Sequence, residues 1–135
     1  METLHITVSQ AQGRVPVTLF RLNGRANLGT IKQLEAKARE AVEAGTRNLL
    51  LDLSEAPSVT SAGLRAIHVI YTLLRDASPE AGNEAAVPGP VEGKLKSPHL
   101  KLLNPSPDVL RVLEIAGYTL FLEIHDNLKD AIASF

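Results

Sequence analysis

The sequence contains no cysteine among its 135 residues. This absence excludes disulfide bonds, catalysis by a thiolate and metal sites built on cysteine ligands. Disulfides are typical of oxidising compartments, so a chain without cysteine fits a reducing one. We therefore expect a cytoplasmic protein that folds without covalent cross-links.

The chain also has almost no net charge and no long hydrophobic run. Fourteen Lys and Arg residues against fifteen Asp and Glu residues leave a formal charge of −1. This balance provides no basic footprint for nucleic acid or an anionic membrane, while a charge near zero permits self-association into a homo-oligomer. No apolar stretch approaches the roughly 20 residues of a membrane span, and Met1 to His5 carry an acid rather than a basic cluster. We expect neither membrane insertion nor a signal peptide.

The composition and length of the chain are typical of one globular domain of ordinary size. Hydrophobic residues make up 44% of the chain and charged residues 21%, close to the averages of soluble domains. A chain of this length has room for a single core, so we predict one domain over residues 1–135.

Hydrophobic periodicity predicts alternating strands and helices. A period of two predicts a hairpin within 4–22, and a continuous apolar run predicts a buried strand at 48–53. A short strand is predicted at 100–103, and a further β-rich run at 118–124. Helical spacing predicts four helices: 31–42 stopped by Gly45, a second one with Thr60 or Ser61 as N-cap, 105–116, and a last one capped by Asp126. The predicted fold is α/β, with a mixed central sheet of about five strands flanked by about four helices. Residues 77–98 hold four Pro and three Gly without apolar periodicity, and we predict a mobile insertion there.

Enzyme and metal motifs are poorly represented. Gly24 and Gly29 precede a helix but match neither phosphate-binding spacing, and the four histidines are far apart in sequence. We therefore expect no metal and no cofactor. His68, between apolar residues of the second helix, is expected to be a partly buried, hydrogen-bonded core residue. A triad of Ser61, His68 and Asp52 lacks the G-x-S-x-G elbow, and Asp52 is expected to bind backbone amides of the turn that follows it.

The informative segment joins the buried strand to the second helix. Two adjacent hydroxyl residues, Thr60 and Ser61, stand at the helix start, although a cap needs only one. Ala62 and Gly63 follow, and their small side chains are expected to leave Ser61 accessible to another protein. Phosphorylation there would add about −1.5 to −2 charges beside the positive end of the helix dipole. The domain should tolerate this charge, whereas a partner docked over it should not.

At this segment the chain resembles the STAS family of sulfate transporters and bacterial anti-sigma factor antagonists. The family pattern is a strand ending in Asp-Leu-Ser, a short turn, and Asp-Ser-Ser/Ala-Gly-Leu opening a helix. The matching stretches here are Asp52-Leu53-Ser54 with Thr60-Ser61-Ala62-Gly63-Leu64, the Asn23-Gly24-Arg25 turn followed by Leu28, the 100–103 strand with 104–109, and the helix end 112–118. Nearly the whole chain is covered, apart from the insertion at 77–98.

The resemblance implies a non-enzymatic antagonist that binds an anti-sigma factor with serine kinase activity. It also implies release of that partner when Ser61 is phosphorylated. The docking surface implied by the resemblance comprises Asn23, Gly24, Arg25, Asn27, Leu28, Thr60, Ser61, Ala62, Gly63, Leu64 and Arg65.

Thr60 departs from the family pattern, which usually has an acidic residue at this position. Thr60 could therefore itself be modified, or both hydroxyls could cap the helix of a STAS scaffold that is never phosphorylated. A cytoplasmic STAS accessory module of a membrane transport system is the alternative from another class. An enzyme using His68 or Asp52 is the weakest of the readings.

Overall fold

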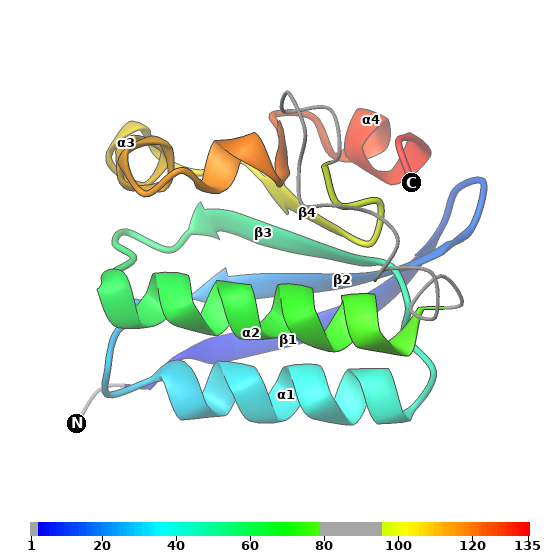
Figure 1. Cartoon of the computed structure of the whole chain (residues 1–135), viewed down its shortest axis with the longest axis horizontal. Helices are drawn as coiled ribbons and strands as arrows, with labels where there is room; N and C mark the ends of the chain where they lie inside the picture. Colours follow the sequence, from blue (N-terminus) through cyan, green and yellow to red (C-terminus); the bar gives the residue numbers. More distant parts are fainter. Residues whose placement is uncertain (1–2, 79–95) are drawn as a thin grey trace.

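The computed structural model describes residues 3–78 and 96–135 (Figure 1). The strands are β1 (His5–Gln12), β2 (Pro16–Asn23), β3 (Leu49–Glu55), β4 (Leu100–Leu103) and β5 (Glu123–His125). The helices are α1 (Ile31–Glu43), α2 (Ser61–Ala77), α3 (Pro107–Ile115) and α4 (Leu128–Ala133), with a short 3-10 helix η2 (Tyr118–Leu120) between α3 and β5.

The strands form one five-stranded mixed sheet in the order β1-β2-β3-β4-β5. The opening hairpin pairs β1 with β2 antiparallel, and β2 through β5 are parallel to their neighbours. β3 lies in the middle, as expected of a strand that reads as a continuous apolar run. The single α/β domain with a mixed sheet, predicted from periodicity, is confirmed.

Three helices share one face of this sheet. Parallel strands that follow one another in sequence order are joined by right-handed crossovers, which place the connecting helices on the same side. Figure 1 shows α1 and α2 lying side by side across the sheet. The main core lies beneath them and α3, where every second strand residue is buried among helix residues, including Phe20, Leu51, Leu102, Ile67 and Leu113.

The opposite face is covered by α4, a helix of six residues. Here the alternate strand residues Val17, Leu19, Leu50 and Leu103 pack against Ala131. A buried lysine, Lys101, shares this face because it alternates with the core residues of β4.

Two local predictions are wrong. The run 118–124 is a strand only at its end, because Gly117 adopts a left-handed conformation (φ 83°) and the chain turns through η2 before β5 begins. The last helix is capped by Asn127, whose side chain accepts a hydrogen bond from the Asp130 amide, rather than by Asp126. In both places a local turn competes successfully with the apolar pattern.

The predicted insertion at 77–98 falls mostly on residues 79–95, which lie outside the described residues. Its described ends are ordered: Ala77 is the last residue of α2, and Ser78 and Ser97 are buried. None of the helices in the described ranges is long and apolar enough to cross a bilayer.

Candidate functional site

The site is built where two loops meet at the carboxyl edge of the parallel strands. The loop after β2 runs beside the loop after β3, and Ala26 forms a parallel bridge with Val59. The Ala26 amide donates to the Ser58 carbonyl at 3.2 Å, and the Thr60 amide donates to the Ala26 carbonyl at 3.0 Å. These bonds hold the start of α2 against the loop that leads into α1.

Gly63 is what allows the two loops to come so close. A Cβ atom at this position would lie 2.4 Å from the Ala26 carbonyl oxygen and 2.9 Å from the Val59 side chain. The expectation that Gly63 leaves Ser61 open to a partner therefore needs correction, because its small size serves packing between the loops. Gly63 is buried and Leu64 is 8% exposed, so both lie beneath the expected docking surface.

The two adjacent hydroxyls have different roles. Thr60 is the N-cap of α2: its Oγ1 accepts a hydrogen bond from the Gly63 amide at 3.4 Å and donates to the Ala26 carbonyl at 3.3 Å. Ser61 is the first residue of the helix and is exposed. Within the described part of the chain its hydroxyl makes no hydrogen bond. The cap needs one hydroxyl, Thr60 provides it, and Ser61 remains available.

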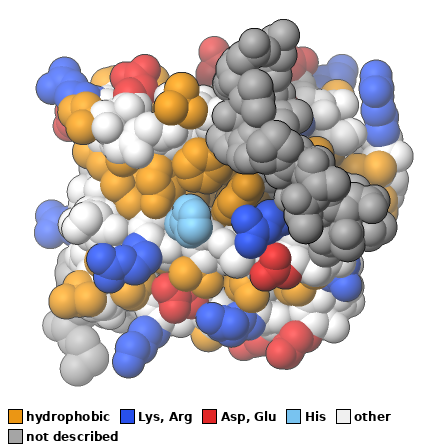
Figure 2. Space-filling view, viewed as in Figure 1, with side chains coloured by type: hydrophobic (Ala, Val, Ile, Leu, Met, Phe, Trp, Pro, Cys, Tyr) orange, Lys and Arg blue, Asp and Glu red, His pale blue; other side chains and the backbone are white. Residues whose placement is uncertain are grey.

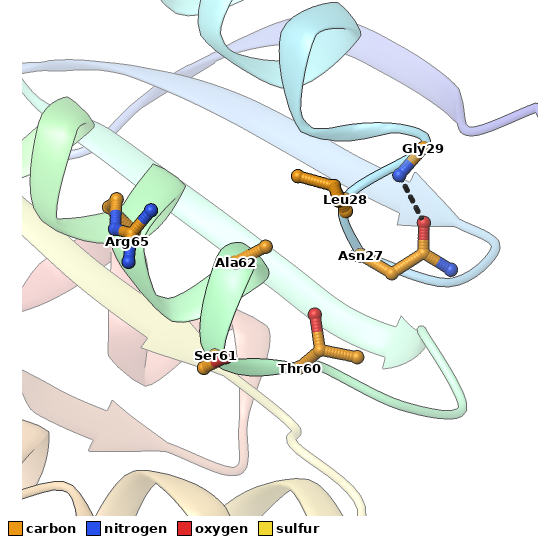
Figure 3. Close-up of a pocket in the computed structure, with 7 residues that line it drawn as sticks. All are labelled: Asn27, Leu28, Gly29, Thr60, Ser61, Ala62 and Arg65. Carbon is orange, nitrogen blue, oxygen red and sulfur yellow. Dashed lines mark hydrogen bonds between the residues drawn. The ribbon is translucent and has the colours of Figure 1, made fainter.

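An open hollow of about 560 Å³ lies between the two loops (Figure 3). The Thr60 hydroxyl points toward the loop that carries Asn27, and Leu28 extends from this loop toward α2. Leu28 is 77% exposed, so an apolar side chain is accessible for contact at the rim of the hollow. The lining residues are Asn27, Leu28, Gly29, Thr60, Ser61, Ala62 and Arg65.

The loop that carries Leu28 is held by its own polar contacts. The Asn27 side chain accepts from the Gly29 amide at 2.9 Å, and the buried Thr30 hydroxyl donates to the Arg25 carbonyl at 2.6 Å. These bonds shape the loop before α1 begins, so Leu28 is presented from a structured turn.

Asn23, Gly24 and Arg25 occupy the start of this loop, outside the lining of the hollow. The Asn23 side-chain amide donates to the Glu55 carboxylate at 2.9 Å, and Gly24 adopts a φ of 130° that favours glycine. Of the expected docking residues, the structure therefore gathers Asn27, Leu28, Thr60, Ser61, Ala62 and Arg65 around one hollow.

Arg65 lies one helical turn after Ser61 and is exposed. Among the described residues its guanidinium has no hydrogen-bond or ion-pair partner. Its charge does act on Tyr118: burial raises the pKa of that phenol above its ordinary value of 10.0, and the nearby Arg65 cation opposes the rise. The Tyr118 hydroxyl donates to the Leu64 carbonyl at 2.8 Å.

The structure corrects one histidine prediction and confirms the role expected of Asp52. His68 is exposed rather than a core residue, because the buried side of α2 runs through Gly63, Ala66, Ile67, Ile70 and Leu74. Asp52 accepts from the Ser54 amide at 2.9 Å, as expected, and also from Arg21 at 3.1 Å. Asp52 alternates with core residues and so faces the side of the sheet opposite α2, which means that no Ser-His-Asp triad is assembled.

Residues 3–78 and 96–135 contain no group of three or more His, Asp or Glu side chains arranged to hold a metal ion. The chemistry that the hollow offers is therefore that of an exposed hydroxyl, an exposed leucine and a cation without an ion-pair partner in the described ranges. This combination suits recognition of another protein.

Comparison with known proteins agrees with this description. Residues 8–79 match the STAS domain. BtrV of Bordetella bronchiseptica, which is named as an anti-sigma factor antagonist, is 30% identical over 114 residues, covering 84% of this chain and 82% of BtrV.

Solved structures share the fold at lower identity. An anti-sigma factor antagonist from Mycobacterium paratuberculosis superposes with a TM-score of 0.71 at 18% identity, over 97% of this chain and 92% of that one. SpoIIAA, an anti-sigma factor antagonist solved in its unphosphorylated form, gives a TM-score of 0.60 at 15% identity, over 94% and 93% of the two chains. The phosphorylated form of the Bacillus SpoIIAA gives 0.60 at 17% identity, over 95% and 96%.

Proposed function

The chain belongs to the STAS domain family, and we propose that it is an anti-sigma factor antagonist whose docking surface is switched off by phosphorylation of Ser61. The proposed partner is an anti-sigma factor with serine kinase activity. The proposed docking surface is the rim of the hollow, formed by the exposed Leu28, Thr60, Ser61 and Arg65 together with the partly buried Asn27 and Ala62.

The observation that supports this proposal is that the Thr60 and Ser61 hydroxyls have different structural roles. Thr60 is committed to the cap, where a phosphate would break the bonds that hold the two loops together. Ser61 is exposed and has no hydrogen bond to lose within the described residues. Modification of Ser61 would therefore leave the fold intact, which favours Ser61 over Thr60 as the regulated position.

Charge explains why such a modification would release a partner. A phosphate on the first residue of α2 lies at the positive end of the helix dipole, so the folded domain tolerates it. A partner that covers Ser61 would have to desolvate this new dianion and place its own surface against it. The switch thus acts on the interface and leaves the fold unchanged.

The relatives support the same assignment. BtrV is named as an anti-sigma factor antagonist, and SpoIIAA, whose fold is shared, has been solved both with and without phosphorylation. An antagonist needs an anti-sigma factor to bind, and the exposed Leu28 beside Ser61 provides the apolar contact for one.

The test is quantitative binding of the purified anti-sigma factors of the source organism to wild type, Ser61→Ala and Ser61→Asp. We expect Ser61→Ala to bind like wild type and Ser61→Asp to bind at least about tenfold more weakly. Ser9→Asp, at an exposed position on β1, is the matched control for the added charge and should bind normally.

Incubation of each complex with ATP, followed by mapping of the phosphorylated residues, completes the experiment. Phosphate on Ser61 that is absent from the Ser61→Ala variant is the expected result. Equal binding by the Ala and Asp variants, or phosphate on Thr60 alone, would contradict the proposal. Equal binding of all variants to a transporter component would instead favour the accessory-module alternative.

A further inference from the structure

A second feature of the same face lies between α2 and η2, outside the hollow. Four rings that contact one another in tilted or edge-on geometry form what we call the aromatic patch: His68, Tyr71, Tyr118 and Phe121. Ring centroids are 5.1 Å apart for Tyr71–Phe121 and for Tyr118–Phe121, and 5.7 Å apart for His68–Tyr71. The patch therefore joins the middle of α2 to the segment that follows α3.

The surroundings of the patch are unusually apolar for a solvent-facing surface. His68 is exposed, and the three larger rings are only partly buried. Leu120 in η2 is 62% exposed, and Ile115 at the end of α3 is 80% exposed. Figure 2 shows hydrophobic side chains gathered beside a histidine over α2, with basic side chains on either side. Exposed apolar side chains that gather on one face mark interaction sites in soluble proteins.

Arg65 makes the aromatic patch continuous with the hollow. It lines the hollow beside Ser61, and its charge acts on the Tyr118 hydroxyl. That hydroxyl is bonded to the Leu64 carbonyl, so η2 is fixed to the first turns of α2. The hollow and the patch are thus two parts of one surface, and the Arg65 cation lies between them.

Charge indicates which kind of partner fits. The other cation at the patch, Arg75, lies over the Tyr71 ring at 5.8 Å and pairs with Asp76 at 3.3 Å, whereas Arg65 has no such partner within the described residues. A second copy of this chain, docked through the same face, would add its own Arg65 cation to the interface and so a second positive charge. A segment that carries a carboxylate beside an apolar side chain would satisfy both the cation and the rings.

We propose that the aromatic patch is the second half of the docking surface and binds an acidic, amphipathic segment of the anti-sigma factor. A carboxylate of that segment pairs with Arg65, and its apolar side chains cover Leu120 and the rings. This inference rests on the proposed function and extends the interface from the hollow across α2 to η2.

The test compares two exposed leucines in the complete chain. Leu120→Glu places a negative charge at the patch, and Leu128→Glu makes the same change on α4, where the leucine is 39% exposed. Titrating purified anti-sigma factors of the source organism, we expect about a tenfold or greater loss of affinity for Leu120→Glu and less than about a twofold change for Leu128→Glu. Circular dichroism and the thermal midpoint of each variant should match wild type.

Two further measurements separate the apolar contact from the charge. The chain has no cysteine, so a single cysteine at Leu120 or Leu128 carries a polarity-sensitive fluorophore at one defined position. On binding, the emission should shift to shorter wavelength for Leu120→Cys and stay unchanged for Leu128→Cys. Affinity should fall more steeply with salt for wild type than for Arg65→Gln.

The outcomes distinguish this inference from the function on which it rests. If Ser61→Asp abolishes binding while Leu120→Glu and Arg65→Gln bind like wild type, the patch proposal is wrong and the switch proposal stands. If Leu120→Glu loses binding but Ser61→Asp does not, the patch stands without the switch. Wild type that binds no anti-sigma factor overturns both. A dimer of the chain alone, seen by sedimentation and abolished by Leu120→Glu, overturns the proposed occupant.

Discussion

The two faces of the sheet are held together by different interactions. The face beneath α1, α2 and α3 buries a continuous set of apolar side chains, and α2 alone contributes Leu64, Ala66, Ile67, Ile70 and Leu74. The face beneath α4 buries a charged residue, Lys101, whose ammonium donates to the Ser134 carbonyl at 2.8 Å and to its hydroxyl at 3.0 Å. The same ammonium lies 3.3 Å from Glu123 and 4.9 Å from the centre of the Phe135 ring.

The difference follows from topology. Crossovers of one hand place three helices on one side, so the other side is left to a six-residue helix that offers little apolar area. Specific polar contacts hold that helix where apolar packing is sparse. The proposed docking surface belongs to the apolar side, so its geometry depends on core packing, and changes on the α4 side are expected to leave it in place.

The largest effect is expected from the apolar face. Ile67 is 1% exposed in the centre of α2, and Ile67→Ala should lower the free energy of unfolding by about 2–5 kcal/mol. The adjacent His68 is exposed, and His68→Ala should change stability by about 0.5 kcal/mol or less. Denaturant unfolding of the two variants measures both. Similar losses at the two positions would show that the buried side of α2 is not where the structure places it.

A substitution on the face beneath α4 should destabilise the protein less, and its effect should be confined to that face. Lys101→Met keeps the length of the side chain but leaves the Ser134 carbonyl and Glu123 without the ammonium. We expect the free energy of unfolding to fall by about 1–3 kcal/mol, with faster hydrogen exchange in α4 and unchanged affinity for the proposed anti-sigma factor partner. Weaker partner binding by this variant would break the proposed independence of the two faces.

Removing each of the two hydroxyls at the edge of the apolar face should change the stability of the protein by different amounts. Thr60→Ala removes the cap of α2 and should cost about 0.5–2 kcal/mol. Ser61→Ala removes a hydroxyl without a partner in the described chain and should change stability by about 0.5 kcal/mol or less. Thermal unfolding of the two single variants makes the comparison. Equal costs would mean that Ser61 shares the capping role.

The smallest effect is a pH dependence on the α4 face. Burial tends to raise the pKa of Glu123, but the hydrogen bond with His125 at 2.9 Å and the charge of Lys101 outweigh it, so this pKa lies below its ordinary value of 4.5. The folded carboxyl therefore binds fewer protons than the unfolded one. Its stabilising contribution is complete above the unfolded pKa and is lost as pH falls through the folded pKa.

This effect is measured as the difference in unfolding free energy between wild type and Glu123→Gln. We expect the advantage of wild type to shrink as the pH is lowered from about 6 to about 3. A difference that stays constant over this range would show that the carboxylate does not contribute through its charge.

Most of the fold was predictable, because binary patterns report directly on burial. Leu49, Leu51 and Leu53 face the main core while Leu50 faces α4, as a strand buried on both sides requires. The predictions were wrong at η2 and at the last cap, where a left-handed glycine and an Asn side chain set the turn. Such choices depend on hydrogen bonds of a few residues, which apolar periodicity does not report.

The sequence predicted part of the lining of the candidate site, but it did not predict the roles of the individual residues. The adjacent hydroxyls of Thr60 and Ser61 pointed to the start of α2, but which one caps the helix depended on the Ala26 carbonyl, 34 residues earlier in the chain. Gly63 was expected to leave Ser61 accessible to a partner, whereas its small size allows close packing against Ala26. The prediction that His68 lies on the buried side of α2 was wrong. Adjacent residues of a helix point in different directions, so the apolar residues next to His68 do not show which way its side chain faces.

The sequence by itself determined the class of the fold, the order of its elements and the segment in which to look for a regulated hydroxyl. These are properties of local pattern, since each depends on residues within a turn or two of one another. Only the tertiary structure decided that Thr60 is committed and Ser61 available, that Leu28 and Arg65 share one hollow, and that the aromatic patch adjoins it. Those relations join residues from separate elements, and their distances are set by how the helices pack on the sheet.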